Sequence, residues 1–202
     1  MIKRLFDIFS SLIGLILLSP FLFLISFFVL FSSPGGIFYR QIRVGKNGKD
    51  FRLWKFRSMR PDADKKGLLT VGGRDPRVTG VGYFLRKYKI DELPQLINVL
   101  VGNMSLVGPR PEVRKYVAMY SPEQMRVLDV QPGITDYASI EYSDENELLA
   151  KSADPEKTYI KEIMPAKLKL NMKYIEESRG TMLVALRTDL KIIFRTIGKI
   201  FG

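Results

Sequence analysis

The sequence predicts an α+β fold that is mostly helical, and three observations support this prediction. A long apolar segment over residues 8–31 has the length and composition of a membrane helix. Two segments rich in aromatic and branched residues follow it and have the pattern of one small β-hairpin. Much of the remaining chain carries helix start signals and apolar residues at helical spacing. We therefore expect one membrane element followed by one domain of ordinary size.

The N-terminal segment contains no charged residue between Asp7 and Arg40. Hydropathy alone favours a single spanning helix, which is too long for a signal-peptide core and lacks a small-residue cleavage site. Pro20 lies in the middle of the apolar run, where it removes a backbone hydrogen bond and kinks the helix, and Ser19 can satisfy part of that loss. Because a kink permits the helix to turn back, a re-entrant form is the alternative.

Positive residues flank the apolar run on both sides, whereas a spanning helix usually carries this bias on one side only. They are Lys3 and Arg4 before the run and Arg40, Arg43 and Lys46 after it. This distribution favours the re-entrant form, in which both ends face the cytoplasm.

The predicted hairpin joins Ile37–Val44 to Asp50–Met59 through a turn at Gly45–Gly48. Strand alternation places Lys55 and Arg57 on one face of the second arm. Most charged residues on such a strand are simply exposed to solvent, and this is the plainest interpretation of the two cations.

An adjacent acidic pair, Asp91-Glu92, opens the next predicted helix. In this prediction Asp91 is the N-cap, Pro94 lies where a missing N–H costs little, and Gly102 fits the left-handed position after the last turn. The same pattern is ordinary helix punctuation, which needs no function.

The surroundings of the acidic pair indicate phosphate chemistry. Cations precede the pair at Arg86, Lys87 and Lys89, and the turn Gly108–Pro111 holds Arg110 in a stiff loop after the helix. Carboxylates ringed by fixed cations are typical of sites that bind and transform phosphates.

The composition excludes several kinds of active site. The 202 residues contain no Cys and no His, which excludes disulfides, thiol catalysis, imidazole bases and most zinc sites. Lys and Arg number 32 against 21 Asp and Glu, which gives a net charge of +11. Such a charge favours an anionic partner, whether nucleic acid, phospholipid headgroups or a phosphorylated substrate.

Other segments have the pattern of a framework. We expect a loop over residues 60–80, a short helix over 82–89, and a helix start with capping-box spacing at Ser121–Gln124. Asp154-Pro155 opens a further helix that Pro165 interrupts or kinks.

The C-terminal segment, residues 181–202, is predicted to be an amphipathic helix. Its cations recur at four-residue spacing and form one basic stripe, made of Arg187, Lys191, Arg195 and Lys199. A helix on an anionic membrane surface and a core-facing helix with solvated cations share this pattern. We favour the membrane, because residues 8–31 already anchor the chain there.

Seven short motifs, in chain order, resemble those of the bacterial sugar transferases, and more narrowly the monotopic phosphoglycosyl transferases. They are Lys55-Phe-Arg-Ser-Met59, Arg74-Asp-Pro-Arg-Val78, Phe84-Leu-Arg86, Asp91-Glu-Leu-Pro-Gln95, Met104-Ser105, Gly108-Pro-Arg-Pro111 and Pro132-Gly-Ile-Thr135. One tetrapeptide is weak support, but seven in order over most of the chain argue against chance.

This resemblance implies an enzyme that transfers a phospho-sugar from a UDP-sugar to undecaprenyl phosphate and releases UMP. Such a reaction starts the assembly of a bacterial glycoconjugate: a capsule, O-antigen, exopolysaccharide or glycoprotein glycan. Asp91 is then the nucleophile and the ligand of Mg²⁺, and Glu92 is a second catalytic residue. The implied substrate contacts are Lys55, Arg57, Arg86, Pro109, Arg110 and Pro111.

The resemblance also implies an arrangement at the membrane. Residues 1–36 form a re-entrant membrane helix, broken at Ser19-Pro20, and a turn. Residues 37–202 form the catalytic domain on the cytoplasmic face of the inner membrane, with amphipathic interfacial helices that contact anionic phospholipids. The sequence does not specify the oligomeric state, and a homodimer is one option.

The chain departs from the commonest family pattern at three places. Asp136 stands where many members have Gly, Asn103 stands where they have Asp, and an acidic stretch at Glu141–Glu145 replaces a short Asn-Gly-Arg sequence. These departures bear on the contacts of residues 136–146, and the sequence leaves the sugar and the glycan pathway open.

Two other functions are kept as alternatives. One is a basic, membrane-anchored binding protein without catalysis, although the chain carries no recognised nucleic-acid-binding motif and we expect no nucleic acid partner. The other is a membrane-bound phosphatase or hydrolase that passes the same aspartyl phosphate to water.

Overall fold

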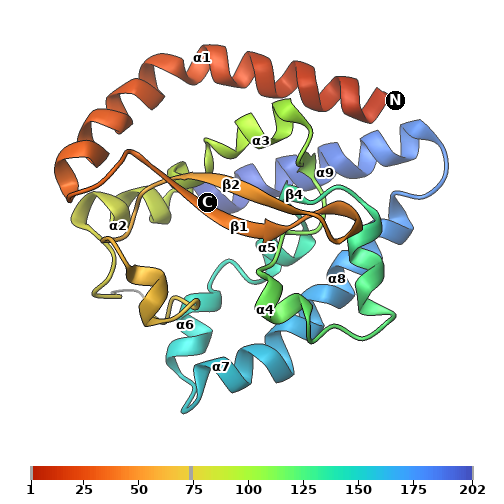
Figure 1. Cartoon of the computed structure of the whole chain (residues 1–202). Coiled ribbons are helices and arrows are strands. Elements are labelled where there is room, and N and C mark those ends of the chain that lie inside the picture. Colours follow the sequence, from red (N-terminus) through yellow and green to blue (C-terminus); the bar gives the residue numbers. More distant parts are fainter. Residues whose placement is uncertain (1, 73–74, 202) are drawn as a thin grey trace.

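A computed structural model describes residues 2–72 and 75–201, so Arg74 of the second motif lies outside the described part. The protein is α+β and mostly helical, as predicted (Figure 1). Its α-helices are α1 (Ile2–Ser32), α2 (Gly80–Lys87), α3 (Gln95–Val101), α4 (Arg114–Val117), α5 (Tyr137–Glu141), α6 (Glu145–Ala150), α7 (Pro155–Thr158), α8 (Met164–Glu177) and α9 (Met182–Phe201). Its strands are β1 (Phe38–Val44), β2 (Asp50–Phe56), β3 (Ser105–Val107) and β4 (Gly133–Thr135).

Helix α1 arches over one end of the molecule (Figure 1). It is long and apolar enough to cross a membrane, and only 11% of its most apolar 18-residue window is buried. Pro20 leaves the carbonyl of Ile16 without its usual amide donor, and the hydroxyl of Ser19 donates to that carbonyl at 2.8 Å. The expectation that Ser19 offsets part of the loss at Pro20 is therefore confirmed.

Both ends of α1 pack on the rest of the protein, whereas its middle is exposed. Near the start, Asp7 and Ser11 are buried, and Gly14 lies against Leu96 of α3. Near the end, Val29 is buried in a small apolar cluster with residues of β2 and α2. The two ends of this helix thus contact one and the same domain.

Strands β1 and β2 form the predicted hairpin, paired antiparallel from Phe38 opposite Phe56 to Val44 opposite Asp50. Asn47 in the turn has a φ of 57°, a conformation that Asn tolerates better than most residues. The second arm ends at Phe56 rather than Met59, so the predicted strand was too long.

Strands β3 and β4 form a parallel pair in which Ser105 lies opposite Gly133 and Val107 opposite Thr135. A methyl group on Gly133 would lie 2.1 Å from the backbone nitrogen of Gly108, so both positions need glycine for this close approach. The pairing joins the motif that ends at Pro111 to the motif that begins at Pro132.

Helix α8 runs through the main apolar core, which it shares with residues of α5, α6 and α9. A π-helical turn, Tyr159–Ile163, joins α7 to α8 just before Pro165, so the predicted interruption is confirmed. Ser121 and Gln124 form the predicted capping box through reciprocal bonds of 2.8 and 3.3 Å, although the turn that follows, Gln124–Asp129, is 3₁₀ rather than α.

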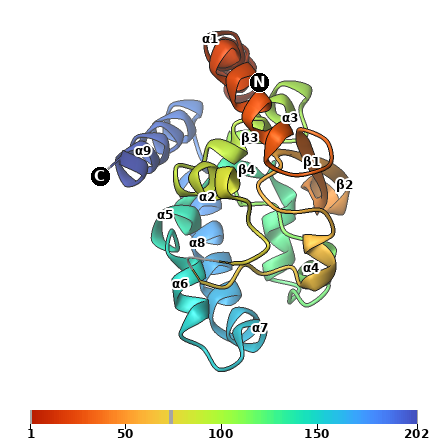
Figure 2. The same cartoon turned by 90° about the vertical axis from the view of Figure 1, so that its left-hand side faces the viewer.

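Helix α9 has three faces. Asp189 and Ile192 are buried against the domain, while Leu183 and Phe194 are 78% and 70% exposed. The basic stripe lies between these two faces, and one of its members, Arg195, pairs with Glu141 at 3.1 Å. Helices α1 and α9 lie towards one end of the molecule and α6 and α7 towards the other (Figures 1 and 2).

Candidate active site

The acidic pair lies in a 3₁₀ turn, Ile90–Glu92, between α2 and α3. The prediction that Asp91 caps α3 is wrong, because Pro94 occupies the N-cap position and the chain is already helical at Leu93. A side chain inside this turn does not reach the first amides of the helix. Gly102 has a φ of 93° after the last residue of α3, as predicted.

The pair borders a cavity of about 680 Å³. The lining comes from the end of β2, the segment after it, the end of α2, the turn after β3, and helices α5, α6, α8 and α9. Such a volume lies within the range of small-molecule sites. The cavity therefore has room for a substrate beside the carboxylates.

Glu92 is held by two cations. The guanidinium of Arg110 donates through both terminal nitrogens to the two Glu92 oxygens, with the longer bond at 3.0 Å, and Lys55 Nζ donates at 2.9 Å. Burial alone would raise the pKa of Glu92, but Arg110 and Lys55 outweigh it and hold the pKa well below the ordinary value. Glu92 is thus a fixed anion that orients two cations.

Asp91 is the opposite case. Asp91 is 3% exposed, and no described residue donates a hydrogen bond to its carboxylate. Burial raises the pKa of Asp91 above its ordinary value; the charge of Lys55 opposes this rise and the charge of Glu92 adds to it. A carboxylate that is buried, basic and without a protein partner is available to a ligand in the cavity.

Lys55 reaches the acidic pair from the second-last residue of strand β2. Burial lowers its pKa, and the attraction of Glu92 opposes this effect. The hydrogen bond to Glu92 and the charge of Asp91 nearby favour the ammonium form.

Arg110 is positioned by its own backbone as well as by Glu92. Its backbone amide donates to Asp136 at 3.0 Å, and its guanidinium also donates to the carbonyl of Ile134 at 3.2 Å. The second oxygen of Asp136 accepts from the amide of Ser139 at 2.6 Å and caps α5. The departure from the family pattern at Asp136 therefore has a structural role: it ties the Arg110 loop to α5.

Arg86 and Arg57 line the same cavity but have different surroundings. Arg86 donates to the hydroxyl of Thr70 at 2.9 Å. The guanidinium of Arg57 donates to carbonyls at the end of α1, those of Val29 and Ser33. Lys55 and Arg57 thus bind different groups, although the Arg57 amide still donates to the carbonyl of Ile37 at 2.9 Å, one residue beyond the end of β2. Their placement on one face stays a prediction.

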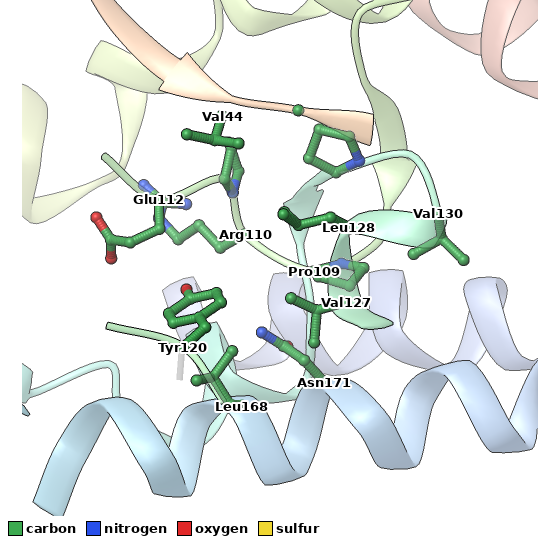
Figure 3. A pocket seen from close by; sticks show the side chains of 13 residues that line it. Val44, Pro109, Arg110, Glu112, Tyr120, Val127, Leu128, Val130, Leu168 and Asn171 are labelled. Atoms are coloured by element: carbon green, nitrogen blue, oxygen red, sulfur yellow. The ribbon is translucent and has the colours of Figure 1, made fainter. Parts of the chain in front are cut away.

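The two prolines of the Arg110 turn differ in what they line. Pro111 lines the large cavity, and both Pro109 and Pro111 line a separate cavity of about 20 Å³ between the turn and α8 (Figure 3). This small cavity also contacts Leu168 and Asn171 of α8 and has room for about one water molecule. Pro109 therefore supports the turn on the side that faces α8.

At this site Asp91 is the carboxylate available to bind a magnesium ion. In residues 2–72 and 75–201 no three carboxylates gather into a dedicated metal cage. Glu92 is engaged by Arg110 and Lys55, while the carboxylate of Asp91 has no protein partner. Because Mg²⁺ is commonly held by one or two carboxylates together with substrate phosphates and water, these residues fit an ion that arrives with a diphosphate.

Several cavity residues were not singled out from the sequence. Glu112 accepts hydrogen bonds from Arg43 at 3.0 Å and from the hydroxyl of Tyr159 at 2.6 Å. Lys167 pairs with Glu145 at 2.6 Å on the wall formed by α6 and α8. Glu112 directly follows the Pro111 motif, and this adjacency was the available signal; the residues of α6 and α8 carry no local motif.

Comparison with known proteins identifies the family of this chain. The bacterial sugar transferase family matches residues 1–202. The chain is 39% identical over 210 residues to the UDP-glucose:undecaprenyl-phosphate glucose-1-phosphate transferase of Escherichia coli K12, covering 100% of the chain and 40% of that protein. It is 37% identical over 199 residues to the UDP-N-acetylgalactosamine-undecaprenyl-phosphate N-acetylgalactosaminephosphotransferase of Aeromonas hydrophila, covering 97% of the chain and 43% of that protein.

A third relative is the exopolysaccharide production protein PSS of Rhizobium leguminosarum bv. phaseoli, 43% identical over 146 residues, with 69% of the chain and 73% of that protein covered. The chain thus spans less than half the length of the first two relatives. The match over its own length is complete, and the chain belongs to the bacterial sugar transferase family.

Proposed function

We propose that the protein transfers a phospho-sugar from a UDP-sugar to undecaprenyl phosphate through a covalent intermediate on Asp91, and so begins the assembly of a glycoconjugate. The observation that carries this proposal is the buried carboxylate of Asp91, which has no hydrogen-bond donor among the described residues and borders a cavity with cations around it. Two relatives carry names that describe sugar-phosphate transfer to undecaprenyl phosphate, which supports the same reaction class.

In the first step, an oxygen of Asp91 attacks the phosphorus that carries the sugar. The bond from this phosphorus to the bridging oxygen breaks, and UMP leaves with that oxygen and its electron pair. The product on the protein is an acyl phosphate that still carries the sugar. Covalent catalysis of this kind replaces one difficult displacement by two easier ones and needs no histidine.

In the second step, a phosphate oxygen of undecaprenyl phosphate attacks the same phosphorus. The bond to Asp91 breaks, the carboxylate is regenerated, and the product is an undecaprenyl diphosphate sugar. No proton has to be removed from the acceptor oxygen when the phosphate is ionised.

The remaining residues of the site offset the negative charge of three reacting groups. Arg110 and Arg86 hold phosphate oxygens through N–H groups that remain beside their protein bonds, and Lys55 keeps positive charge next to Asp91. Asp91 also provides a ligand for Mg²⁺. When bound, Mg²⁺ neutralises diphosphate charge and makes the phosphorus a better electrophile.

We also propose that α1 enters the membrane and returns, so that the site faces the cytoplasm at the inner membrane. Contacts of both ends of α1 with one domain support this arrangement, since a spanning helix would carry its ends to opposite sides. Pro20 and the exposed apolar middle support a bent, lipid-facing helix.

Release of UMP tests the reaction. Purified protein with Mg²⁺ and a panel of UDP-sugars should release UMP with sustained turnover only when undecaprenyl phosphate is present. Sustained release without the acceptor would instead identify a hydrolase. No release with any UDP-sugar would contradict the enzymatic function and would favour a binding protein without catalysis.

Single cysteines test the membrane arrangement, because the natural sequence has none. In inverted membrane vesicles the cytoplasmic face is on the outside. Lys46→Cys and Ile2→Cys should both react there with an impermeant maleimide. Labelling of the two positions from opposite sides would show a spanning helix.

A further inference from the structure

We propose that the first two turns of α1 position the active-site loops, so that the membrane helix and the catalytic residues form one mechanical unit. The positioning residues are Lys3, Arg4 and Asp7 of α1 with Asp189 of α9. The proposal rests on the proposed function in one respect, that Arg110 and Asp91 act on the substrate.

Two of these residues hold the strand that leads into the Arg110 turn. Lys3 Nζ donates to the carbonyl of Val107 at 3.1 Å, and a carboxylate oxygen of Asp7 accepts from the amide of Leu106 at 3.0 Å. Val107 is three residues before Arg110, which binds Glu92. A shift at the start of α1 is therefore transmitted to the guanidinium of Arg110 through the short segment from Val107 to Arg110, which Pro109 stiffens.

Arg4 holds the other active-site segment. Its guanidinium donates to the carbonyl of Leu100 at 2.9 Å and to that of Val99. These carbonyls lie in the last turn of α3, where a cation is favoured, and Val99 also accepts from the amide of Gly102 at 3.1 Å. Since the acidic pair directly precedes α3, neighbouring residues of α1 fix both sides of the site.

Helix α9 completes the cluster. Asp189 is buried and pairs with Lys3, and it accepts a hydrogen bond from the hydroxyl of Tyr174 at 2.9 Å. The same hydroxyl lies 3.2 Å from the carbonyl of Val107. Asp189 thus orients Lys3, the residue that binds the strand, and connects α9 to the same point.

A simpler role for Lys3 and Arg4 is to mark the cytoplasmic end of α1 by their charge. Charge alone needs no particular partner, and a headgroup-facing lysine would point to the lipid. Here each cation reaches a defined backbone carbonyl, and Asp189, the carboxylate that pairs with Lys3, is buried. Loss of such a contact in a site that depends on alignment can cost on the order of 10²-fold in rate.

The exchange variant Ile2→Lys/Lys3→Ile separates the two roles. It keeps the flanking charge but moves the ammonium by one residue, about 100° around the helix. We expect kcat for UMP release to fall by roughly 10- to 100-fold, with membrane association and cysteine-labelling topology unchanged. Lys3→Arg keeps the charge and a long donor and should restore most of the lost rate.

A second measurement does not depend on activity. Hydrogen exchange of the Leu106 and Arg110 amides should accelerate in the exchange variant, while the amides of α8 keep their protection, which also shows that the variant is folded. Wild-type kcat and wild-type exchange at these amides in the folded exchange variant would overturn the proposal. A rate loss accompanied by altered topology would also overturn it, in favour of the charge-marking role.

Failure of the proposed function gives a different result. In that case the wild-type protein shows no acceptor-dependent UMP release, and the exchange measurement alone decides whether α1 positions the Arg110 turn.

Discussion

A charged cluster beneath α1 and the charged cluster at the large cavity differ in one respect. In the cluster beneath α1, Lys3 and Asp189 are paired with each other, and Asp7 accepts a backbone amide. In the cluster at the large cavity, Glu92 is paired with Arg110 and Lys55, but Asp91 is left without a donor among the described residues. Both clusters lie in the same small domain and use the same residue types.

The carboxylates with partners support the fold, whereas the carboxylate without a partner is available to react. A buried carboxylate without a partner destabilises the fold, so its retention beside a cavity is a cost that a bound ligand can offset. A buried carboxylate with partners fixes the groups around it and is not free to react. Among residues 2–72 and 75–201, Asp91 differs in this way from the buried aspartates Asp7, Asp136 and Asp189, each of which holds a neighbouring group in place.

The largest effect is expected from Asp91→Asn. The amide cannot attack phosphorus, so turnover should fall by a factor on the order of 10³ or more, as for loss of other covalent nucleophiles. The measurement is acceptor-dependent UMP release by folded, membrane-bound protein. Near-normal release would falsify the assignment and would make Asp91 a structural residue like Asp189.

The covalent intermediate gives a direct control for this variant. Wild type incubated with UDP-sugar and Mg²⁺ but no acceptor should gain the mass of one phospho-sugar, and Asp91→Asn should not. A peptide map that assigns the adduct to Glu92 would keep the two-step reaction and exchange the roles of the two carboxylates.

The same two carboxylates should affect stability in opposite directions. Burial raises the pKa of Asp91, so its contribution to stability is present below the unfolded pKa and is lost as the pH rises through the folded pKa. Despite burial, Arg110 and Lys55 lower the pKa of Glu92, so its contribution is present above the unfolded pKa and is lost as the pH falls through the folded pKa.

At pH 7.5, Glu92→Gln should therefore destabilise the protein by about 3 kcal/mol, because it leaves two cations without their anion. Asp91→Asn should leave the thermal midpoint unchanged or raise it by a few degrees. Thermal unfolding of both variants in the same detergent measures the difference. Equal losses of stability would mean that Asp91 has a partner after all.

A smaller effect is expected on the pH dependence of the reaction. If Asp91 attacks as the carboxylate, UMP release should decline at acidic pH with an apparent pKa above that of an ordinary aspartate, because burial raises it. Lys55 opposes that rise, so Lys55→Met should move the acidic limb to higher pH. Lys49→Met, at an exposed position in the hairpin turn outside the cavity lining, is the matched control and should leave the limb in place.

The sequence was informative where the physical signal is local. Pro20 beside Ser19, the hairpin turn, the capping box at Ser121 and the left-handed Gly102 all follow from short-range rules, and the structure confirms them. The acidic pair was also singled out correctly as the centre of a charged cluster. Its assignment as a helix cap failed, because a 3₁₀ turn before the helix competes with the cap and has no distinct sequence pattern.

Contacts between distant segments could not be predicted from local rules. Lys3 and Val107 are 104 residues apart, and Lys55 and Glu92 are 37 apart. Strand alternation placed Lys55 and Arg57 on one face but did not show that Arg57 binds carbonyls at the end of α1. The role of Asp136 was also hidden, since a buried side chain that holds one distant amide has the same sequence signal as any loop aspartate.

The smallest effect should come from exposed charges, which complete the comparison between paired and unpaired groups. On α9, Arg195 is engaged by Glu141, whereas Arg187, Lys191 and Lys199 have no carboxylate partner within the described residues. Lys199 lines the large cavity, whereas Arg187 and Lys191 flank the exposed apolar face. These two cations are suited to anionic headgroups, each contributing about 1 kcal/mol near such a surface. Replacing them with Gln should reduce the hydrogen-exchange protection that α9 gains in anionic over neutral nanodiscs. The protein should remain bound through α1 and should keep its turnover within about threefold, because exposed charges contribute little to the fold.

Two results would contradict this prediction. Unchanged protection would mean that the stripe is a solvated face. A large loss of turnover would show that α9 acts on the site through Asp189 more strongly than its surface charges suggest.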